Sequence, residues 1–329
     1  MKYDVYGIGT ALIDFQVKTK DEDLLRFNIS KGIFKQMTKQ EFEKIYGELK
    51  ESKILMKAGG SCANTIYGFS LLGGKAALTG KIGDDKLGDY FEKEIGVNVK
   101  NNLIRCKGDI TGNVILFSTP DKERSFAVYL GAGIKFKKED LILNEIKESK
   151  ILHVEGYQLE HKEFREAIIH AMDFAKKNNV LVSLDVSDAG VISRNKELMI
   201  NVLKNYVDVV FANEDEAKAL TGKEREEALD FLGKLCNIAV VKIGKEGCLI
   251  KNKNKIIRVP GYKVKLIDSA GAGDMYAAGF LYGLSKNYEM ETCGRLGNYF
   301  AAKVVERIGA RLDKIEKEEI NRILFTKNI

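Results

Sequence analysis

Ile267-Asp268-Ser269-Ala270-Gly271-Ala272-Gly273-Asp274 is a run of mostly small residues that leads into the apolar segment 275–284. Apolar residues before it, small residues within it and a helix-compatible run after it predict a strand, a tight turn and the N-terminus of a helix. A turn with so few side chains lets a ligand approach the backbone closely. The first N–H groups of the helix have no acceptor within it, and the helix dipole favours negative charge there, so this turn suits an anion.

The carboxylate of Asp274 falls in the first turn of this predicted helix, where it can point at whatever occupies the anion site. Phosphoryl transfer needs stabilisation of charge on the transferred group and a residue that takes the proton of the attacking hydroxyl. The backbone of Gly271, Ala272 and Gly273 could supply the first, and Asp274 the second. The alternative is an acidic residue that only complements the helix dipole.

Composition narrows the class of protein. A chain of 329 residues is expected to form one large domain with an insertion, or two domains. Apolar residues make up 45% of the chain and charged residues 30%, as in ordinary globular proteins. The 53 Lys and Arg residues are interspersed with 47 Asp and Glu residues, which argues against a surface for nucleic acid.

The cysteines and the N-terminus predict a cytoplasmic protein. The 5 cysteines are far apart and show no metal-binding spacing, so they are expected to be reduced thiols. Asp4 and Asp14 interrupt what would be the apolar part of a signal peptide. No apolar run approaches the ~20 residues that a membrane span requires. We therefore expect no membrane association.

The order of strand and helix patterns predicts an α/β fold. From about residue 140, apolar strand patterns alternate with helix patterns, which predicts a mostly parallel sheet covered by helices on both faces. Earlier, segments 111–118 and 125–130 alternate as antiparallel strands joined by a turn. A hairpin within a strand–helix alternation predicts a small β-rich appendage.

The N-terminal strand pattern carries two competing signals. Gly7-x-Gly9 begins a dinucleotide fingerprint, but Leu12 stands where a third glycine is needed. The rival hypothesis of a nicotinamide-dependent oxidoreductase therefore has only these two glycines in its favour. Asp14 follows, near the strand end where open α/β sheets place their ligands. The alternative for Asp14 is a turn or capping residue.

Gly59-Gly60 and Asn64 form a second candidate site. Two adjacent glycines permit backbone angles closed to other residues, which suits a hinge or the close approach of a ligand. Asn64 lies one turn into the predicted helix and offers both donors and acceptors to a polyol. A solvent-facing Asn after a flexible loop is the alternative.

Residues at the ends of two later strands suit a magnesium nucleotide. Asn213-Glu214-Asp215-Glu216 gathers oxygen ligands after an apolar strand, and such ligands suit hydrated Mg²⁺. Ordinary acidity at a helix N-terminus is the alternative. Lys242, Gly244 and Gly247 belong to a strand-to-turn element that could border a nucleotide, as could Asn298 in a later helix, although each alone also fits a structural role.

These motifs together resemble those of the PfkB-type ribokinase family of small-molecule kinases, over nearly the whole chain. In chain order the matching motifs are Gly59-Gly60 through Asn64 to Gly73-Gly74, Gly83-Asp84-Asp85-Lys86-Leu87-Gly88, Asn213-x-x-Glu216 and Asp268 to Asp274. The family implies a ribokinase-like three-layer α/β/α domain, here residues 1–14, 59–109 and 134–329. Residues 15–58 and 110–133 would form a small β-sheet lid that closes over the substrate and excludes water.

The resemblance also implies roles for individual residues. Asp274 matches the catalytic base, and the Gly271-Ala272-Gly273 backbone matches the anion hole. The positions that hold the sugar are matched by Asp14, Gly60, Asn64 and, in the lid, Arg124. The ATP site is matched by Lys242, Gly244 and Asn298, and the motif that organises Mg²⁺, usually through water, by Asn213 and Glu216. The resemblance thus implies ATP as co-substrate and Mg²⁺ as cofactor, and it is compatible with a monovalent cation as well.

One position departs from the family pattern. Ser269 stands where the family most often has Thr; because the hydroxyl is kept, activity is expected to survive. In this family the lid sheet can pair between subunits, so the resemblance is compatible with a monomer or a homodimer.

The residues of several segments are most similar to those of the adenosine-kinase-like branch, notably segments 9–14, 130–133, 155–157 and 213–216. Adenosine is therefore the first choice of phosphoryl acceptor, and a free sugar such as fructose, ribose or 2-keto-3-deoxygluconate is the alternative. Phe15, Phe34 and Tyr157 are candidates for an aromatic clamp on a base, although each also fits lid or core packing. A non-catalytic nucleotide- or sugar-binding protein is the rival from another class.

Overall fold

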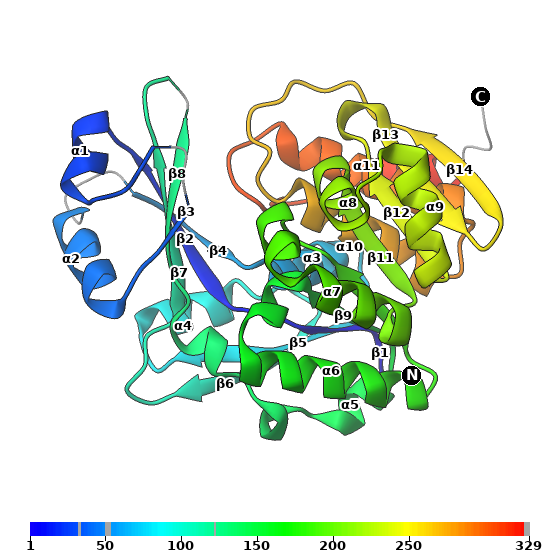
Figure 1. The fold of residues 1–329 in the computed structure, drawn as a ribbon, viewed down its shortest axis with the longest axis horizontal. Coiled ribbons are helices and arrows are strands. Elements are labelled where there is room, and N and C mark those ends of the chain that lie inside the picture. The colour runs from blue at the N-terminus through cyan, green and yellow to red at the C-terminus, as the bar shows by residue number, and fades with distance from the viewer. Residues whose placement is uncertain (32–33, 50–53, 122, 326–329) are drawn as a thin grey trace.

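The computed structural model describes residues 1–31, 34–49, 54–121 and 123–325, except for the side chains of Phe34, Arg124 and Lys317. Within these ranges a 9-stranded sheet has the order β14-β13-β12-β11-β10-β9-β1-β5-β6 (Figure 1). Its strands are β1 Tyr3–Ile8, β5 Ala76–Gly83, β6 Val99–Cys106, β9 Ser149–Glu155, β10 Leu181–Asp185, β11 Val209–Asn213, β12 Ile238–Lys242, β13 Gly247–Asn252 and β14 Lys255–Pro260.

The large sheet is parallel from β6 to β12, and β13 and β14 add an antiparallel edge. Its central strands are buried on both sides because both faces are covered. In β11, Val209 and Phe211 enter one core, whereas Val210 and Ala212 enter the other. The mostly parallel sheet expected from the sequence is confirmed.

Helices cover both faces of this sheet (Figure 1). One face carries α3 Ser61–Leu71, α4 Lys86–Lys93, α10 Ala272–Ser285 and α11 Met290–Val305, with α12 Lys317–Phe325 packed on α11. The other face carries α5 Leu143–Lys147, α6 Lys162–Lys177, α7 Ala189–Tyr206, α8 Glu214–Thr221 and α9 Arg225–Leu235. The result is a three-layer α/β/α arrangement, as the family resemblance implies.

A 5-stranded sheet of order β3-β8-β7-β2-β4 stands to one side of the large sheet (Figure 1). Its strands are β2 Leu12–Lys18, β3 Phe34–Gln36, β4 Ile54–Gly59, β7 Gly112–Ser118 and β8 Arg124–Tyr129. β7 and β8 pair antiparallel, as the alternating pattern predicts. Because β2 begins at Leu12, this second sheet starts before residue 15 and includes Asp14, which the sequence placed with the larger domain.

Two helices, α1 Asp21–Arg26 and α2 Lys39–Leu49, cover one face of the second sheet. The ring of Phe15 in β2 lies 6.3 Å from that of Phe42 and 4.9 Å from that of Tyr46, both in α2. Phe27, at the end of α1, lies 5.8 Å from the ring of Phe117 in β7. The chain's own helices therefore pack on this face of the second sheet.

One expectation from the sequence needs correction. Residues 261–267 form no strand before the small-residue turn, because the backbone N–H of Ile267 bonds to the carbonyl of Val305, at the end of α11, rather than to a neighbouring strand. The glycines of Gly7-x-Gly9, on which the rival oxidoreductase rested, have a packing role. A Cβ on Gly7 would lie 2.5 Å from Ile66, and one on Gly9 would lie 2.9 Å from Cys62, so these glycines let α3 pack against the strand.

None of the helices in the described part of the chain is long and apolar enough to cross a membrane.

Candidate functional site

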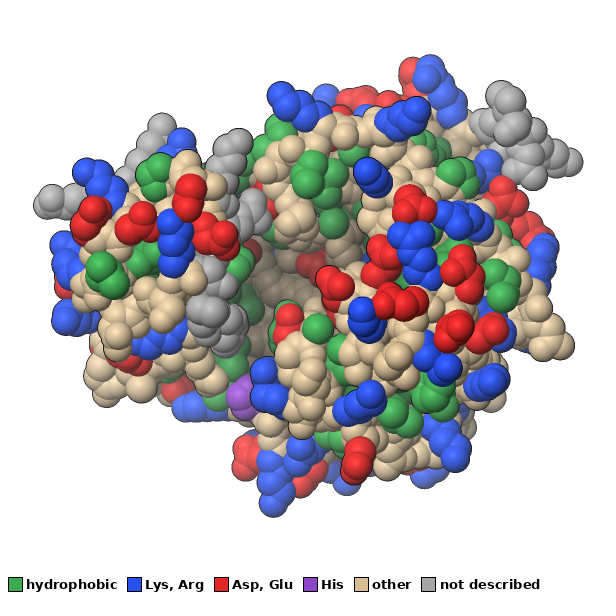
Figure 2. All heavy atoms as spheres, turned by 45° about the horizontal axis from the view of Figure 1, so that its top comes forward, with side chains coloured by type: hydrophobic (Ala, Val, Ile, Leu, Met, Phe, Trp, Pro, Cys, Tyr) green, Lys and Arg blue, Asp and Glu red, His purple; other side chains and the backbone are tan. Residues whose placement is uncertain are grey.

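A cavity of about 1720 Å³ lies between the second sheet and the carboxyl ends of the central strands. Figure 2 shows it as a hollow between the two lobes of the molecule. The position follows from topology: in an open α/β sheet, ligands bind in the crevice beyond the carboxyl ends of the strands. β9, β10, β11 and β12 each deliver polar residues to it, and α10 points its N-terminus at it.

The turn before α10 has the geometry of an anion site. Gly271 caps the helix with φ 72°, a backbone angle that favours glycine. The backbone N–H groups of Gly273 and Asp274 donate to no protein acceptor in the described ranges, and Ser269, Gly271, Ala272, Gly273 and Asp274 all line the cavity. Asp268 braces the turn, because its carboxylate accepts from the N–H of Ala270 at 2.8 Å and from that of Gly309 at 3.0 Å.

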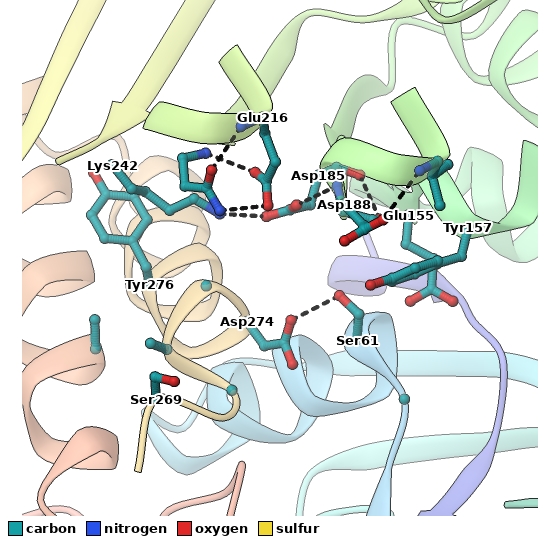
Figure 3. Close-up of a pocket in the computed structure, with 18 of the residues that line it drawn as sticks. Ser61, Glu155, Tyr157, Asp185, Asp188, Glu216, Lys242, Ser269, Asp274 and Tyr276 are labelled. Carbon is teal, nitrogen blue, oxygen red and sulfur yellow. Dashed lines mark hydrogen bonds and ion pairs between the residues drawn. The ribbon is translucent and has the colours of Figure 1, made fainter. Parts of the chain in front are cut away.

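Asp274 is held from two sides by side chains of α3. The hydroxyl of Ser61 donates to Asp274 Oδ1 at 2.7 Å (Figure 3). Asn64 Nδ2 donates to Asp274 Oδ2 at 2.8 Å. Burial raises the pKa of Asp274 above the ordinary value for a carboxyl group, while these two donors oppose the rise. The carboxylate is thus fixed next to the anion site and is more basic than an exposed one.

Lys242, at the end of β12, brings positive charge to the same turn. Its ammonium lies 2.9 Å from Asp185 Oδ2 and 3.1 Å from the position that a Cβ on Gly273 would take. Although burial disfavours the charged form, Asp185 and Glu216 raise the pKa of Lys242 above its ordinary value. The amine therefore stays protonated beside the unpaired N–H groups of α10, where an anion would meet both.

Asn213 and Glu216 form a capping box at the start of α8. The Glu216 carboxylate accepts from the backbone N–H and from the Nδ2 of Asn213, each at 2.7 Å. Burial raises the pKa of Glu216 to about 7, and Lys242 opposes the rise. Both residues line the cavity. No group of three His, Cys, Asp or Glu side chains in the described ranges is arranged to hold a metal. Oxygen atoms such as those of Asn213 and Glu216 are the kind that Mg²⁺ prefers, and two residues alone would leave most of its coordination to water.

The cavity also extends to the residues matched to a nucleotide site. Lys242, Gly244, Gly247 and Asn298 all line it. Asn298 also has a structural task, since its Nδ2 donates to the carbonyl oxygens at the end of β14, Val259 at 3.1 Å and Pro260 at 3.0 Å.

The residues matched to a sugar site gather where β2, β4 and α3 meet. The Asp14 carboxylate packs against Gly59: a Cβ there would lie 2.5 Å from Asp14 Oδ2. Burial raises the pKa of Asp14 to about 7, although the positive charge of Arg311 opposes the rise. Gly60 lines the cavity with φ 91°, whereas Asn64 is buried and uses its amide on Asp274. Arg124 begins β8, and its side chain lies outside the described residues.

The face of the second sheet that is turned to the cavity carries an apolar stripe. It consists of Leu12, Val114, Phe126, Val128 and Leu130. Strand register sets the stripe beside Asp14, because Asp14 pairs with Val114 and Val114 pairs with Val128. Of the three aromatic candidates, Phe15 is buried under α2, and the side chain of Phe34 is outside the described residues. Tyr157 lines the cavity and is 42% exposed (Figure 3).

Glu155, at the end of β9, belongs to the site although the sequence did not single it out for a role. Its carboxylate accepts from the N–H of Cys62 at 2.6 Å and from the N–H of Thr10 at 3.3 Å. Gly60 has no side chain to cap α3, so the carboxylate of Glu155 takes that place. It also ties together the two chain segments that enter the second sheet, which only the fold brings side by side.

The comparisons with known proteins agree with this geometry. Residues 34–318 match the model of the pfkB family of carbohydrate kinases. The crystal structure of adenosine kinase from Sinorhizobium meliloti is similar, with 33% identity, a TM-score of 0.87 and coverage of 95% of this chain and 97% of that one. A probable sugar kinase from Rhizobium etli CFN 42 has 30% identity, a TM-score of 0.89 and 98% coverage of both chains.

Curated relatives include a 5-dehydro-2-deoxygluconokinase of Clostridium botulinum (strain Eklund 17B / Type B), with 30% identity over an alignment of 297 residues and coverage of 85% of this chain and 87% of the relative. The motifs, the fold and the cavity thus agree with the family match, and the chain belongs to the pfkB family of carbohydrate kinases, as a carbohydrate or nucleoside kinase.

Proposed function

We propose that this kinase transfers the γ-phosphoryl group of Mg-ATP to the primary alcohol of a nucleoside, with adenosine as the first choice. The observation that carries the choice of a nucleoside is the apolar stripe beside Asp14. A ribose needs hydroxyl acceptors, which Asp14 offers, and a base needs an apolar or aromatic wall, which the stripe and Tyr157 offer. The similarity to the adenosine kinase of Sinorhizobium meliloti supports the same choice.

The proposed reaction uses the residues around the start of α10. Asp274 takes the proton of the attacking hydroxyl, a contribution on the order of 10²- to 10⁴-fold. The N–H groups of Gly273 and Asp274, together with Lys242, stabilise negative charge on the transferred group. Asn213 and Glu216 would hold hydrated Mg²⁺, which supplies charge neutralisation at the phosphates. Closure of the second sheet over the cavity would exclude water and so favour the acceptor over hydrolysis.

Phosphorylation of a free sugar is the second candidate, because curated relatives carry the name 5-dehydro-2-deoxygluconokinase. A sugar acid needs a cation for its carboxylate. Of the cations that line the cavity, Lys242 is paired with Asp185 at 2.9 Å and Arg194 with Glu160 at 2.7 Å. Lys245 and Lys263 also line it and form no ion pair in the described part of the chain, so the cavity has cations for a sugar acid. The apolar stripe, which a sugar acid would not need, is what favours the nucleoside.

The test is an assay of ADP release with Mg-ATP and a panel of adenosine, inosine, guanosine, ribose, fructose, 2-keto-3-deoxygluconate and 5-dehydro-2-deoxygluconate. Selective turnover of a nucleoside supports the proposal. Turnover of a free sugar alone supports phosphoryl transfer but excludes a nucleoside as the acceptor. No turnover of any compound contradicts the proposal.

Tyr157 is expected to separate the two acceptor classes. A Tyr157→Ala variant should raise the KM for a nucleoside by about 10-fold or more, because base–aromatic stacking contributes about 1–3 kcal/mol per base. Tyr157→Phe, which keeps the ring, is the matched control and should stay close to wild type. Steady-state kinetics at saturating ATP measure both. Equal losses in the two variants would assign the effect to the hydroxyl and remove the base clamp.

Binding of the acceptor is expected to weaken as the pH falls below about 7. Burial raises the pKa of Asp14 to about 7, and substrate hydroxyls donate to its ionised form. Binding therefore favours the ionised carboxylate, and protonation at lower pH competes with it. Calorimetric titration with the acceptor between about pH 5.5 and 8.5 measures this. Asp14→Asn should bind weakly with no such dependence; a wild-type affinity that does not change with pH would contradict the role of Asp14.

A further inference from the structure

Arg311 lies in the segment that follows α11 and bonds to Asn64, the side chain that in turn donates to Asp274. This segment lies against the anion-site turn, since a Cβ on Gly271 would lie 2.3 Å from the carbonyl oxygen of Ala310. The hydroxyl of Tyr67 in α3 holds the next residue, donating to the carbonyl of Leu312 at 3.0 Å. The backbone on both sides of Arg311 is thus fixed to the site.

The guanidinium of Arg311 is enclosed by α3 and α4. Its Nε donates to Asn64 Oδ1 at 2.8 Å, and its Nη1 donates to the carbonyl of Glu94 at 2.7 Å. The group lies 4.9 Å from the ring centre of Tyr67 and 5.9 Å from that of Phe91. Nη2 is buried and has no hydrogen-bond partner in the described ranges. Burying a cation in this way costs free energy unless nearby negative charges or hydrogen bonds compensate it.

The bond from Arg311 determines which way the amide of Asn64 points. An Asn side chain presents an oxygen on one side and an NH₂ group on the other, and arginine can only donate. Because Arg311 occupies the oxygen side, the NH₂ group must face Asp274, to which it donates at 2.8 Å. With the amide reversed, its oxygen would face the Asp274 carboxylate and repel it.

The positive charge of Arg311 acts in the same direction as this hydrogen bond. Burial lowers the pKa of Arg311 to about 10, so it remains protonated, and its charge favours the ionised forms of Asp14 and Asp274. Other charged groups also act on Asp274: Asp185 disfavours its ionised form and Lys242 favours it.

We propose that Arg311 is a positioning residue for phosphoryl transfer: it fixes the amide of Asn64 so that Nδ2 donates to Asp274, which keeps the base ionised and directed at the anion site. The inference rests on the proposed function, since it concerns the base of that reaction. It goes beyond that function in placing a residue of the C-terminal segment, 247 positions from its partner Asn64, in control of the base.

The test compares Arg311→Met with Arg311→Lys. Met keeps the bulk and removes charge and donor, whereas Lys keeps the charge and one donor. Arg311→Met should lower kcat by about 10- to 100-fold, as expected when a charged group loses a hydrogen bond. The acidic limb of its pH–rate profile should move to higher pH, because Asp274 loses a donor, while the KM for ATP stays within about twofold. Arg311→Lys should recover part of both changes. A loss of rate with an unshifted pH profile would reduce Arg311 to a structural role.

Two controls keep the inference separate from folding. Arg307→Met removes an arginine of the same segment that pairs with Asp313 at 2.7 Å on the surface, and it should leave kcat and the profile unchanged. In a double-mutant cycle with Asn64→Ala, Arg311→Met should cost much less than in wild type, because Arg311 acts through Asn64. Additive losses would contradict the proposal.

The inference can fail while the proposed function stands, and the reverse. If wild type turns over no acceptor, the proposed function fails first. The pKa of Asp274 can still be measured by ¹³C NMR of the aspartate carboxyl groups, with Asp274→Asn to assign the signal. A higher pKa in Arg311→Met than in wild type or Arg311→Lys supports the inference, and equal values in all three contradict it.

Discussion

Asp274→Asn is expected to lower kcat by on the order of 10²- to 10⁴-fold, the usual contribution of a positioned general base. The amide cannot take the proton of the attacking hydroxyl. The fold should survive, because the Ser61 hydroxyl that now donates to Asp274 at 2.7 Å can rotate and accept from the new amide. ADP release measured with the best acceptor of the panel, together with Tm, checks both statements.

The pH dependence of this variant is a second readout. In wild type the base works in its ionised form, so the rate falls as the pH drops through the pKa of Asp274, which burial raises. Asp274→Asn should lose this acidic limb. Asp173→Asn, which removes an exposed carboxylate paired with Lys177 on α6, is the control and should keep it. Near wild-type turnover by Asp274→Asn would sink the assignment of the base.

Gly271→Ala is expected to lower kcat by about 100-fold, since a misplacement of about 1 Å at a reacting centre can have that effect. The new Cβ would lie 2.3 Å from the carbonyl oxygen of Ala310 and 2.5 Å from its Cα. Both are backbone atoms, so the turn and the segment after α11 must move apart. That movement displaces the N–H groups of Gly273 and Asp274. Steady-state kinetics and chemical denaturation measure the effects on rate and stability.

Gly222→Ala separates the effect of a strained left-handed backbone from the effect of displacing the turn before α10. Gly222 ends α8 with φ 73°, nearly the angle of Gly271, but a Cβ there would meet nothing within 4 Å. It should lose about 1–2 kcal/mol of stability through its left-handed backbone and keep its kcat. If both variants kept full activity, the turn before α10 would not be the anion site.

Much of the architecture was predictable from local pattern. In β11 the apolar run from Val209 to Ala212 indicates a strand buried on both faces, because a parallel sheet covered by helices leaves neither face to solvent. The turn before α10 was predictable as a candidate anion site because its chemistry resides in backbone N–H groups and glycines that are contiguous in the chain. Asn213 and Glu216 are likewise three residues apart and form their capping box locally.

The prediction of a strand before Ser269 was wrong, because the partner of this segment is not set by its neighbours along the chain. Residues 262–267 have apolar content that suits a strand, yet Leu266 and Ile267 are exposed, and the backbone of Ile267 bonds to the end of α11. Local pattern reports what a segment is able to form, whereas the partner it finds depends on the packing of distant elements.

The sequence by itself determined the α/β sheet, the small-residue turn proposed as the anion site and the position of Asp274, the proposed base, since each depends on neighbours along the chain. Only the tertiary structure decided which side chains meet that base. Ser61 and Asn64 approach Asp274 from α3, Arg311 approaches Asn64 from the C-terminal segment, and Glu155 caps α3 from β9. A lone arginine or glutamate carries no local signal of such a task, because its hydrogen bonds form between elements that become neighbours only when the sheet and its helices assemble.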